Sequence, residues 1–184
     1  MMERIADALP RPRARLAGAV YLLYFLTAIS ADVFGRGRPV VYDAVDLVAS
    51  AFYITVTLLF YYLFKPVSRY VSLLAALLSL SGCANDLLSL FHVAVHKINS
   101  LVFFGPYCLL IGYLIIRSTF LPRFLGVLMA FAGMGWLIFL SPLADRLSTY
   151  LKVLGFLSEL SLCLWLLAKG VNIERWKAQA GAAT

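Results

Sequence analysis

A cluster of polar side chains lies inside a long apolar segment, and these residue types are the ones in the sequence best suited to chemistry. Its members are Ser81, Asn85, Asp86, Ser89, His92 and His96. All except Asp86 recur every three or four residues, so on an α-helix they share one face, with Asp86 at its flank. In a membrane such a face must point into a helix bundle, away from lipid. The pattern predicts a polar interior but names neither a reaction nor a ligand.

The two histidines of this cluster are candidate metal ligands. His92 and His96 are four residues apart, a spacing at which both could bind one metal ion, with Asp86 or an acid from another helix as a third ligand. The pair is equally compatible with interfacial polar side chains that bind nothing. A haem between two helices is disfavoured, because both histidines lie on one helix. The sequence has no Ser-His-Asp order, glycine-rich phosphate loop or paired-cysteine site. We therefore predict no cofactor.

Acidic residues on other segments are expected to meet this cluster. Asp43 and Asp46 begin a second polar stripe that continues through Tyr53, and Glu159 lies inside the last apolar segment. The last helix is predicted to begin at Leu151, which would place Glu159 roughly 12 Å from its outer end. With Asp32 at the end of the first segment, the carboxylates are predicted to gather in the outer half of the bundle.

A carboxylate at that depth needs a partner. An ionised one costs several kcal/mol near the middle of a bilayer, and no lysine or arginine is placed to neutralise Asp86 or Glu159. Candidate partners are Asn85, Ser158, Tyr53, Tyr24, His92 and His96. Two interpretations stay open: the acids tie helices together by hydrogen bonds, or they form a site for a proton, a cation or a small ligand.

The composition is that of an integral membrane protein. Of the 184 residues, 62% are hydrophobic and 14% are charged, whereas a soluble domain is about half apolar and about a quarter charged. The net charge of +7 comes from basic residues at the ends of apolar segments, a distribution that favours lipid headgroups over nucleic acid as partner. The three cysteines lie inside apolar segments, and we interpret them as small apolar side chains.

The apolar segments predict an all-α, polytopic membrane bundle of six transmembrane helices. The predicted helices are Leu16–Phe34, Tyr42–Phe64, Tyr70–Val93, Ser100–Ile116, Phe124–Leu140 and Leu151–Ala168. Residues 1–15 and 169–184 are predicted to be polar cytoplasmic tails, residues 16–168 the transmembrane domain, and residues 141–152 an amphipathic loop. Six helices put both termini on one side, and the excess of basic residues on that side predicts that it is cytoplasmic. Ala28-Ile29-Ser30 would also serve as a signal-peptide cleavage site, but a retained helix is preferred.

Small residues mark one predicted contact between helices. Gly126, Ala130 and Gly133 share a face of the fifth predicted helix, where they would allow close approach of a neighbour. Pro106 lies inside the fourth predicted helix, where it is expected to produce a kink.

Several short segments spread over most of the chain carry a family resemblance: Arg15-Leu16-Ala17-Gly18, Lys65-Pro66-Val67-Ser68-Arg69, Phe103-Phe104-Gly105, Cys108-Leu109-Leu110-Ile111-Gly112-Tyr113-Leu114-Ile115, Arg117-Ser118, Phe120-Leu121-Pro122-Arg123, Leu125-Gly126-Val127-Leu128, Glu159, Leu164-Trp165-Leu166-Leu167 and Lys169-Gly170-Val171. In these segments the chain resembles a bacterial family of small membrane proteins defined as a domain of unknown function (DUF4386). The resemblance implies a multi-pass protein of the bacterial inner membrane without an assigned activity. The chain departs from the family pattern in a short first loop and in His92 and His96.

Three hypotheses for function follow. The favoured one is a binding or transport module for a proton, a cation or a small amphiphile, with Asp46, Tyr53, Asn85, Asp86 and Glu159 at its site. The second is a structural subunit of a larger membrane complex or homo-oligomer. The third, and least favoured, is an intramembrane metal-dependent enzyme that uses His92 and His96.

Overall fold

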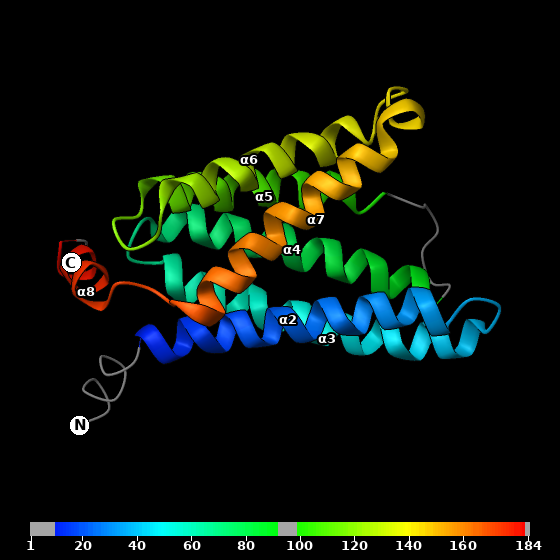
Figure 1. Ribbon diagram of the computed structural model, residues 1–184, viewed down its shortest axis with the longest axis horizontal. Helices are drawn as coiled ribbons and strands as arrows, with labels where there is room; N and C mark the ends of the chain where they lie inside the picture. Colours follow the sequence, from blue (N-terminus) through cyan, green and yellow to red (C-terminus); the bar gives the residue numbers. More distant parts are fainter. Residues whose placement is uncertain (1–9, 92–98, 183–184) are drawn as a thin grey trace.

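The computed structural model describes residues 10–91 and 99–182, and all its regular secondary structure there is helical (Figure 1). The helices are α2 (Pro10–Phe34), α3 (Pro39–Phe64), α4 (Arg69–Leu90), α5 (Leu101–Arg117), α6 (Arg123–Ile138), α7 (Ala144–Ala168) and α8 (Ile173–Gly181). Helices α2 to α7 correspond to the six predicted transmembrane helices. The all-helical membrane bundle is therefore confirmed, and α8 is an addition to it.

The helices differ from the prediction mainly at polar ends. Helix α2 begins at Pro10 rather than Leu16, because proline is well tolerated in the first turn of a helix. Helix α7 begins at Ala144 rather than Leu151, so most of the predicted loop at residues 141–152 is helical. No glycine or proline interrupts the sequence between Pro142 and Gly155, and nothing in it stops a helix. The predicted C-terminal tail contains α8.

Four of the helices can cross a bilayer by length and composition. The four apolar stretches are Arg11–Ala31, Pro39–Phe64, Arg69–Leu90 and Arg146–Ala168, while α5 and α6 are shorter apolar helices. Large apolar side chains such as Leu26, Leu77 and Leu157 are about half exposed on the outside of the bundle. Such a surface is stable against lipid tails. The chain is therefore a multi-pass membrane protein.

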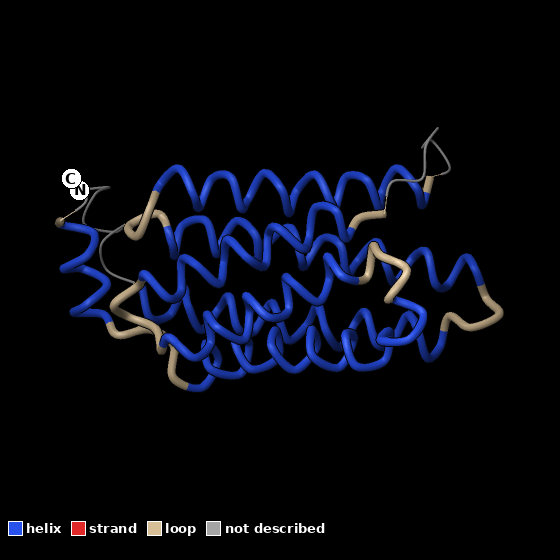
Figure 2. Tube along the Cα trace, turned by 90° about the horizontal axis from the view of Figure 1, so that it is seen from above, coloured by secondary structure: helices blue, strands red, loops and turns tan. Residues whose placement is uncertain are grey.

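The six long helices form a closed ring. Each packs against its neighbours in the chain, and the ring closes where the first helix, α2, packs against the last, α7. The helices alternate in direction along the molecule, so α2 begins and α7 ends at the same end, on the left of Figure 1. Figure 2 shows the same elongated bundle from above, with α8 beyond that end. The predicted arrangement with both ends of the bundle on one side is confirmed.

Glycines hold α5 and α6 in close contact. A Cβ atom added to Gly112 would lie 2.7 Å from the carbonyl oxygen of Gly126, and one added to Gly126 would lie 2.6 Å from that of Gly112. Two turns along, a Cβ on Gly133 would lie 2.8 Å from the carbonyl oxygen of Gly105. The backbones therefore touch, as the predicted small-residue face requires. Helix α5 continues through Pro106.

Candidate functional site

A cavity of about 250 Å³ lies inside the ring, and all six long helices contribute to its lining. The lining residues are Tyr24 and Ala28 of α2, Asp46, Ala49, Ser50 and Tyr53 of α3, Cys83 and Asp86 of α4, Leu101 and Phe104 of α5, Trp136 of α6 and Glu159 of α7. The cavity therefore depends on the assembled ring rather than on any helix pair.

Three carboxylates from three helices converge on this cavity. Asp46 and Asp86 line it while half-buried, and Glu159 lines it with a side chain that is only 9% exposed. Tyr53 lines it as well and is buried. Four of the five residues predicted to bind a proton or small ligand thus surround one space. No lysine or arginine is among the described lining residues. The three carboxylates therefore have no basic side chain of the lining to neutralise them.

The acids lie at different depths. Asp46 is in the second turn of α3, and Asp86 is in the last two turns of α4, at the end of the bundle opposite α8. Glu159 lies about 22 Å along α7 from Ala144, just past the middle of that helix. The depth estimated from the sequence was too small because α7 begins earlier than predicted. The cavity therefore runs from the polar end toward the centre of the bundle.

Glu159 is held at the bottom of the cavity by a hydrogen bond from α2. Its Oε2 atom accepts a hydrogen bond of 2.6 Å from the hydroxyl group of Tyr21, which is 1% exposed. Trp136 of α6 lines the same cavity. The bond from Tyr21 joins the last helix of the ring, α7, to the first, α2. Tyr21 was not predicted as a partner, and its position three residues before Tyr24 is the only signal that points to it.

Asp86 is fixed by a short chain of hydrogen bonds near the mouth of the cavity. Asn85 donates through Nδ2 to the Ser100 hydroxyl at 2.8 Å, and that hydroxyl donates to Oδ1 of Asp86. Asn85, the fifth predicted site residue, therefore acts on the cavity through Ser100 and does not line it. Successive donors of this kind polarise one another, which favours a charged acceptor at the end of the chain.

Aromatic rings form much of the wall between the acids. The rings of Tyr24 and Tyr53 are 4.8 Å apart, and Tyr53 meets Phe104 edge to face at 5.4 Å. Behind them, Tyr53 meets Tyr107 edge to face at 6.2 Å. Packed aromatic side chains have few rotatable bonds, so this wall is rigid. The π-faces of such rings attract cations.

Several predicted groups lie elsewhere. His92 and His96 are outside the described residues, as is the side chain of Asp32. Asp43 is half-buried on α3 but does not line the cavity. Among residues 10–91 and 99–182, no three His, Cys, Asp or Glu side chains are grouped closely enough to hold a metal ion. The cysteines of this region are buried free thiols, and Cys83 forms part of the cavity wall.

Comparison with known proteins places the site within a family without an assigned activity. A family model described as "Domain of unknown function (DUF4386)" matches residues 84–170, a range that contains Asp86, Ser100 and Glu159. An uncharacterized protein of Archaeoglobus fulgidus is 30% identical over 152 residues, which cover 74% of this chain and 89% of that protein. No solved structure is significantly similar to the chain.

Proposed function

Because the chain belongs to the DUF4386 family of unknown function, we propose an activity from its own geometry: it is a membrane protein that binds a small cation in the cavity inside the ring. One observation carries the proposal. Carboxylates from three helices surround a space of about 250 Å³ whose described lining contains no basic side chain. Buried acids are costly in a membrane unless something neutralises them, and a bound cation would do so.

The size and the walls of the cavity narrow the class of ligand. Drug-sized ligands occupy pockets of about 300–1,000 Å³, so this cavity suits a smaller molecule. Its aromatic wall of Tyr24, Tyr53, Phe104 and Trp136 would interact favourably with an organic ammonium group, which is attracted to the π-faces of such rings. We therefore favour a small organic ammonium ion over the proton or the amphiphile that the sequence left open.

The depths of the acids support entry from one end. Asp46 and Asp86 lie near the end opposite α8, where they would attract a cation, and Glu159 lies at the centre, where it would hold one. Basic residues flank the opposite end, and the positive-inside rule would place that end in the cytoplasm. We accordingly propose that the protein lies in the cell inner membrane with both ends of the bundle cytoplasmic and the cavity open to the other side.

Fluorescence of Trp136 provides a direct test, since its indole lines the cavity. Purified protein would be titrated with tetramethylammonium chloride, with sodium and potassium chloride as ionic-strength controls. We expect a saturable change with tetramethylammonium that is absent in Trp136→Phe. Glu159→Gln keeps an oxygen that can accept the Tyr21 hydrogen bond but removes the charge, and it should weaken binding about tenfold or more, which corresponds to at least about 1.4 kcal/mol.

Asp43→Asn is the matched control. It removes one negative charge from α3 one turn before Asp46, at a side chain that does not line the cavity. The control should bind tetramethylammonium as the natural protein does. If Asp43→Asn loses as much affinity for tetramethylammonium as Glu159→Gln does, the losses reflect the overall charge of the protein and not a site in the cavity. If no cation produces a saturable change, the proposal is wrong.

A second candidate, a purely structural role for the acid, is favoured by the bond between Tyr21 and Glu159. This bond joins α2 to α7 where the ring closes. A structural role predicts that Tyr21→Phe lowers stability while the protein binds no cation at all. The two candidates are therefore separated by the titration of the natural protein.

A further inference from the structure

The end of the bundle that carries α8 has a charge opposite to that of the cavity. Glu174 is the one acidic residue described at this end, whereas basic residues occur in every turn there and on α8 itself. Helix α8 lies across the end of the bundle (Figure 1). It is fixed there by Trp176, whose Nε1 donates a hydrogen bond of 3.0 Å to the carbonyl oxygen of Leu63. A short helix in this position, with an indole on its inner side, is typical of a membrane–water interface.

A slot of about 620 Å³ opens between α2 and α3 beneath this helix. Its walls are apolar and include Leu16 of α2, Leu59 and Tyr62 of α3, and Trp176 of α8. Leu16 and Tyr62 are 52% and 59% exposed, so the slot faces the surroundings of the bundle rather than its core. At the level of the bundle those surroundings are lipid.

Two cations mark one end of the slot. Arg13 lies one turn before Leu16 on α2, and Lys65 follows the last residue of α3, about 9 Å along the chain from Leu59. Because α2 and α3 are antiparallel, both cations lie at the same end and the apolar residues lie deeper. Among the described residues, neither the Arg13 guanidinium group nor the Lys65 ammonium group has a hydrogen-bond or ion-pair partner.

We propose that this slot binds an anionic phospholipid. The phosphate group would lie between Arg13 and Lys65, and the upper part of one acyl chain would run along Leu16 and Leu59 toward the centre of the membrane. A free phosphate ion would leave the apolar walls uncovered, and a lipid without net charge would leave both cations uncompensated. Only a molecule that is anionic at the interface and apolar below it matches the whole lining.

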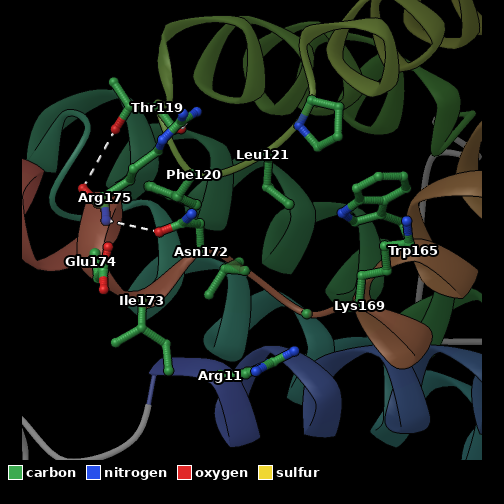
Figure 3. Close-up of a pocket in the computed structure, with 13 residues that line it drawn as sticks. Arg11, Thr119, Phe120, Leu121, Trp165, Lys169, Asn172, Ile173, Glu174 and Arg175 are labelled. Carbon is green, nitrogen blue, oxygen red and sulfur yellow. Dashed lines mark hydrogen bonds between the residues drawn. The ribbon is translucent and has the colours of Figure 1, made fainter.

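A neighbouring cavity at the same end provides a useful contrast (Figure 3). It has a volume of about 650 Å³ and lies between the turn after α5, the end of α7 and the start of α8. Two of its three cations have partners: Arg175 donates through Nη1 to the carbonyl oxygen of Thr119 at 3.4 Å, and the Lys169 ammonium lies 5.0 Å from the centre of the Trp165 ring. Arg11 lies on the opposite side of the space in Figure 3. This cavity lacks the gradient from charge to apolar wall that distinguishes the slot.

Native mass spectrometry of the full-length chain in detergent tests the proposal. The protein would be titrated with phosphatidylglycerol and with phosphatidylcholine of the same acyl chains. We expect tighter binding of phosphatidylglycerol. The double variant Arg13→Gln/Lys65→Gln should weaken that binding about tenfold or more, because it removes both charges that attract the anionic headgroup. Binding of phosphatidylcholine should not change.

Two further variants test whether the lipid binds in the slot itself. Arg69→Gln/Lys177→Gln removes the same charge at the same end from side chains outside the slot, and phosphatidylglycerol binding should stay within about twofold of the natural value. Leu16→Trp keeps the charge and fills the slot from an exposed position, so it should weaken binding of phosphatidylglycerol without unfolding the protein. Circular dichroism would verify that the variants are folded.

Three results would overturn the proposal. Equal losses in the two double variants would mean that the lipid responds only to overall charge. Loss of binding in Arg11→Gln/Arg175→Gln, with the slot variant unaffected, would place the lipid in the neighbouring cavity. Displacement of phosphatidylglycerol by equimolar inorganic phosphate would identify a site for a free anion.

Discussion

The interface between α5 and α6 is closed, whereas the ring that all six long helices form encloses an open cavity. Between α5 and α6, Gly112 and Gly126 face each other and the two backbones touch. Around the cavity, Tyr53, Phe104 and Trp136 project inward and hold the helices apart. The comparison teaches that the size of the facing side chains helps to decide where a membrane bundle keeps an internal space.

The acidic side chains line the open cavity and not the closed interface between α5 and α6. The acids lie where the aromatic side chains leave room, and two of them accept hydrogen bonds from hydroxyl groups: Glu159 from Tyr21 and Asp86 from Ser100. No buried side-chain nitrogen or oxygen of the described residues lacks a hydrogen bond. The cavity is thus a fully bonded polar region and not a packing defect.

Gly126→Leu should have the largest effect, because it places a side chain where two backbones touch. The added Cβ would lie 2.6 Å from the carbonyl oxygen of Gly112, and neither backbone can move without separating α5 from α6. We expect a loss of at least about 3 kcal/mol in the free energy of unfolding. Unfolding by dodecyl sulfate in mixed micelles would measure it.

Gly135→Ala is the control on the same helix. There an added Cβ would meet only the ends of the Leu151 and Leu154 side chains, at 3.5 and 3.8 Å. Alanine also favours helix over glycine, so stability should be unchanged or slightly higher. A large loss in Gly135→Ala would show that α6 tolerates no change at any position, and the comparison between the two regions would fail.

Tyr21→Phe tests the hydrogen bond at the bottom of the cavity. Removal of the hydroxyl leaves the nearly buried Glu159 with one partner fewer, and we expect a loss of about 1–2 kcal/mol in the free energy of unfolding. Tyr70→Phe makes the same chemical change at a side chain that is 84% exposed and should change stability little. Thermal unfolding in detergent would compare them. Equal losses of stability in the two variants would show that the Tyr21 hydrogen bond does not stabilise the contact between α2 and α7.

Thr57→Val tests a polar contact in the closed part of the bundle. The hydroxyl groups of Thr57 and Ser79 are 2.6 Å apart and join α3 to α4. Interhelical hydrogen bonds in membranes contribute about 0.6 kcal/mol on average, and a loss of this order is expected. Thr55→Val is the matched control, since its hydroxyl bonds only to Ala51 of its own helix. A loss in the control as large as in Thr57→Val would contradict the interhelical explanation.

Ala28→Leu should have the smallest effect on stability. Its side chain lines the cavity, so the added methyl groups would enter open space, and the free energy of unfolding should change by less than about 1 kcal/mol. The tetramethylammonium response of Trp136 should fall at the same time, because less space remains. A destabilisation comparable to that of Gly126→Leu would mean that the cavity walls cannot accommodate added volume.

The sequence was sufficient for features that depend on helical periodicity. Polar residues that recur every three or four positions share one helix face, which is why the placement of Asp46, Tyr53 and Asp86 toward a common interior could be predicted. The small-residue contact of α6 followed from the same reasoning. The number and direction of the long helices followed from the apolar segments.

Features that depend on contacts between distant segments were not predictable in this way. The pairing of Tyr21 with Glu159 requires α2 to lie beside α7, and no periodic pattern encodes that contact. The depth of Glu159 was misjudged because charged residues near Lys152 resemble a loop, although a helix passes through them. Helix α8 is short, and a helix of this length depends on docking, here through Trp176, for its stability.

The junction of α2 and α7 has a consequence for biosynthesis. Gly18 lies so close to the backbone of α7 that a Cβ on it would be 2.5 Å from the amide nitrogen of Leu167, and the Cys163 thiol donates to the Gly18 carbonyl. The ribosome delivers α7 after the other five long helices, so the first span waits in the bilayer with this flank uncovered until α7 has been made. A nascent chain that stalls before residue 159 has neither the deepest acid nor the wall that encloses it. The cavity therefore comes into being only when α7, the sixth long helix, joins the other five.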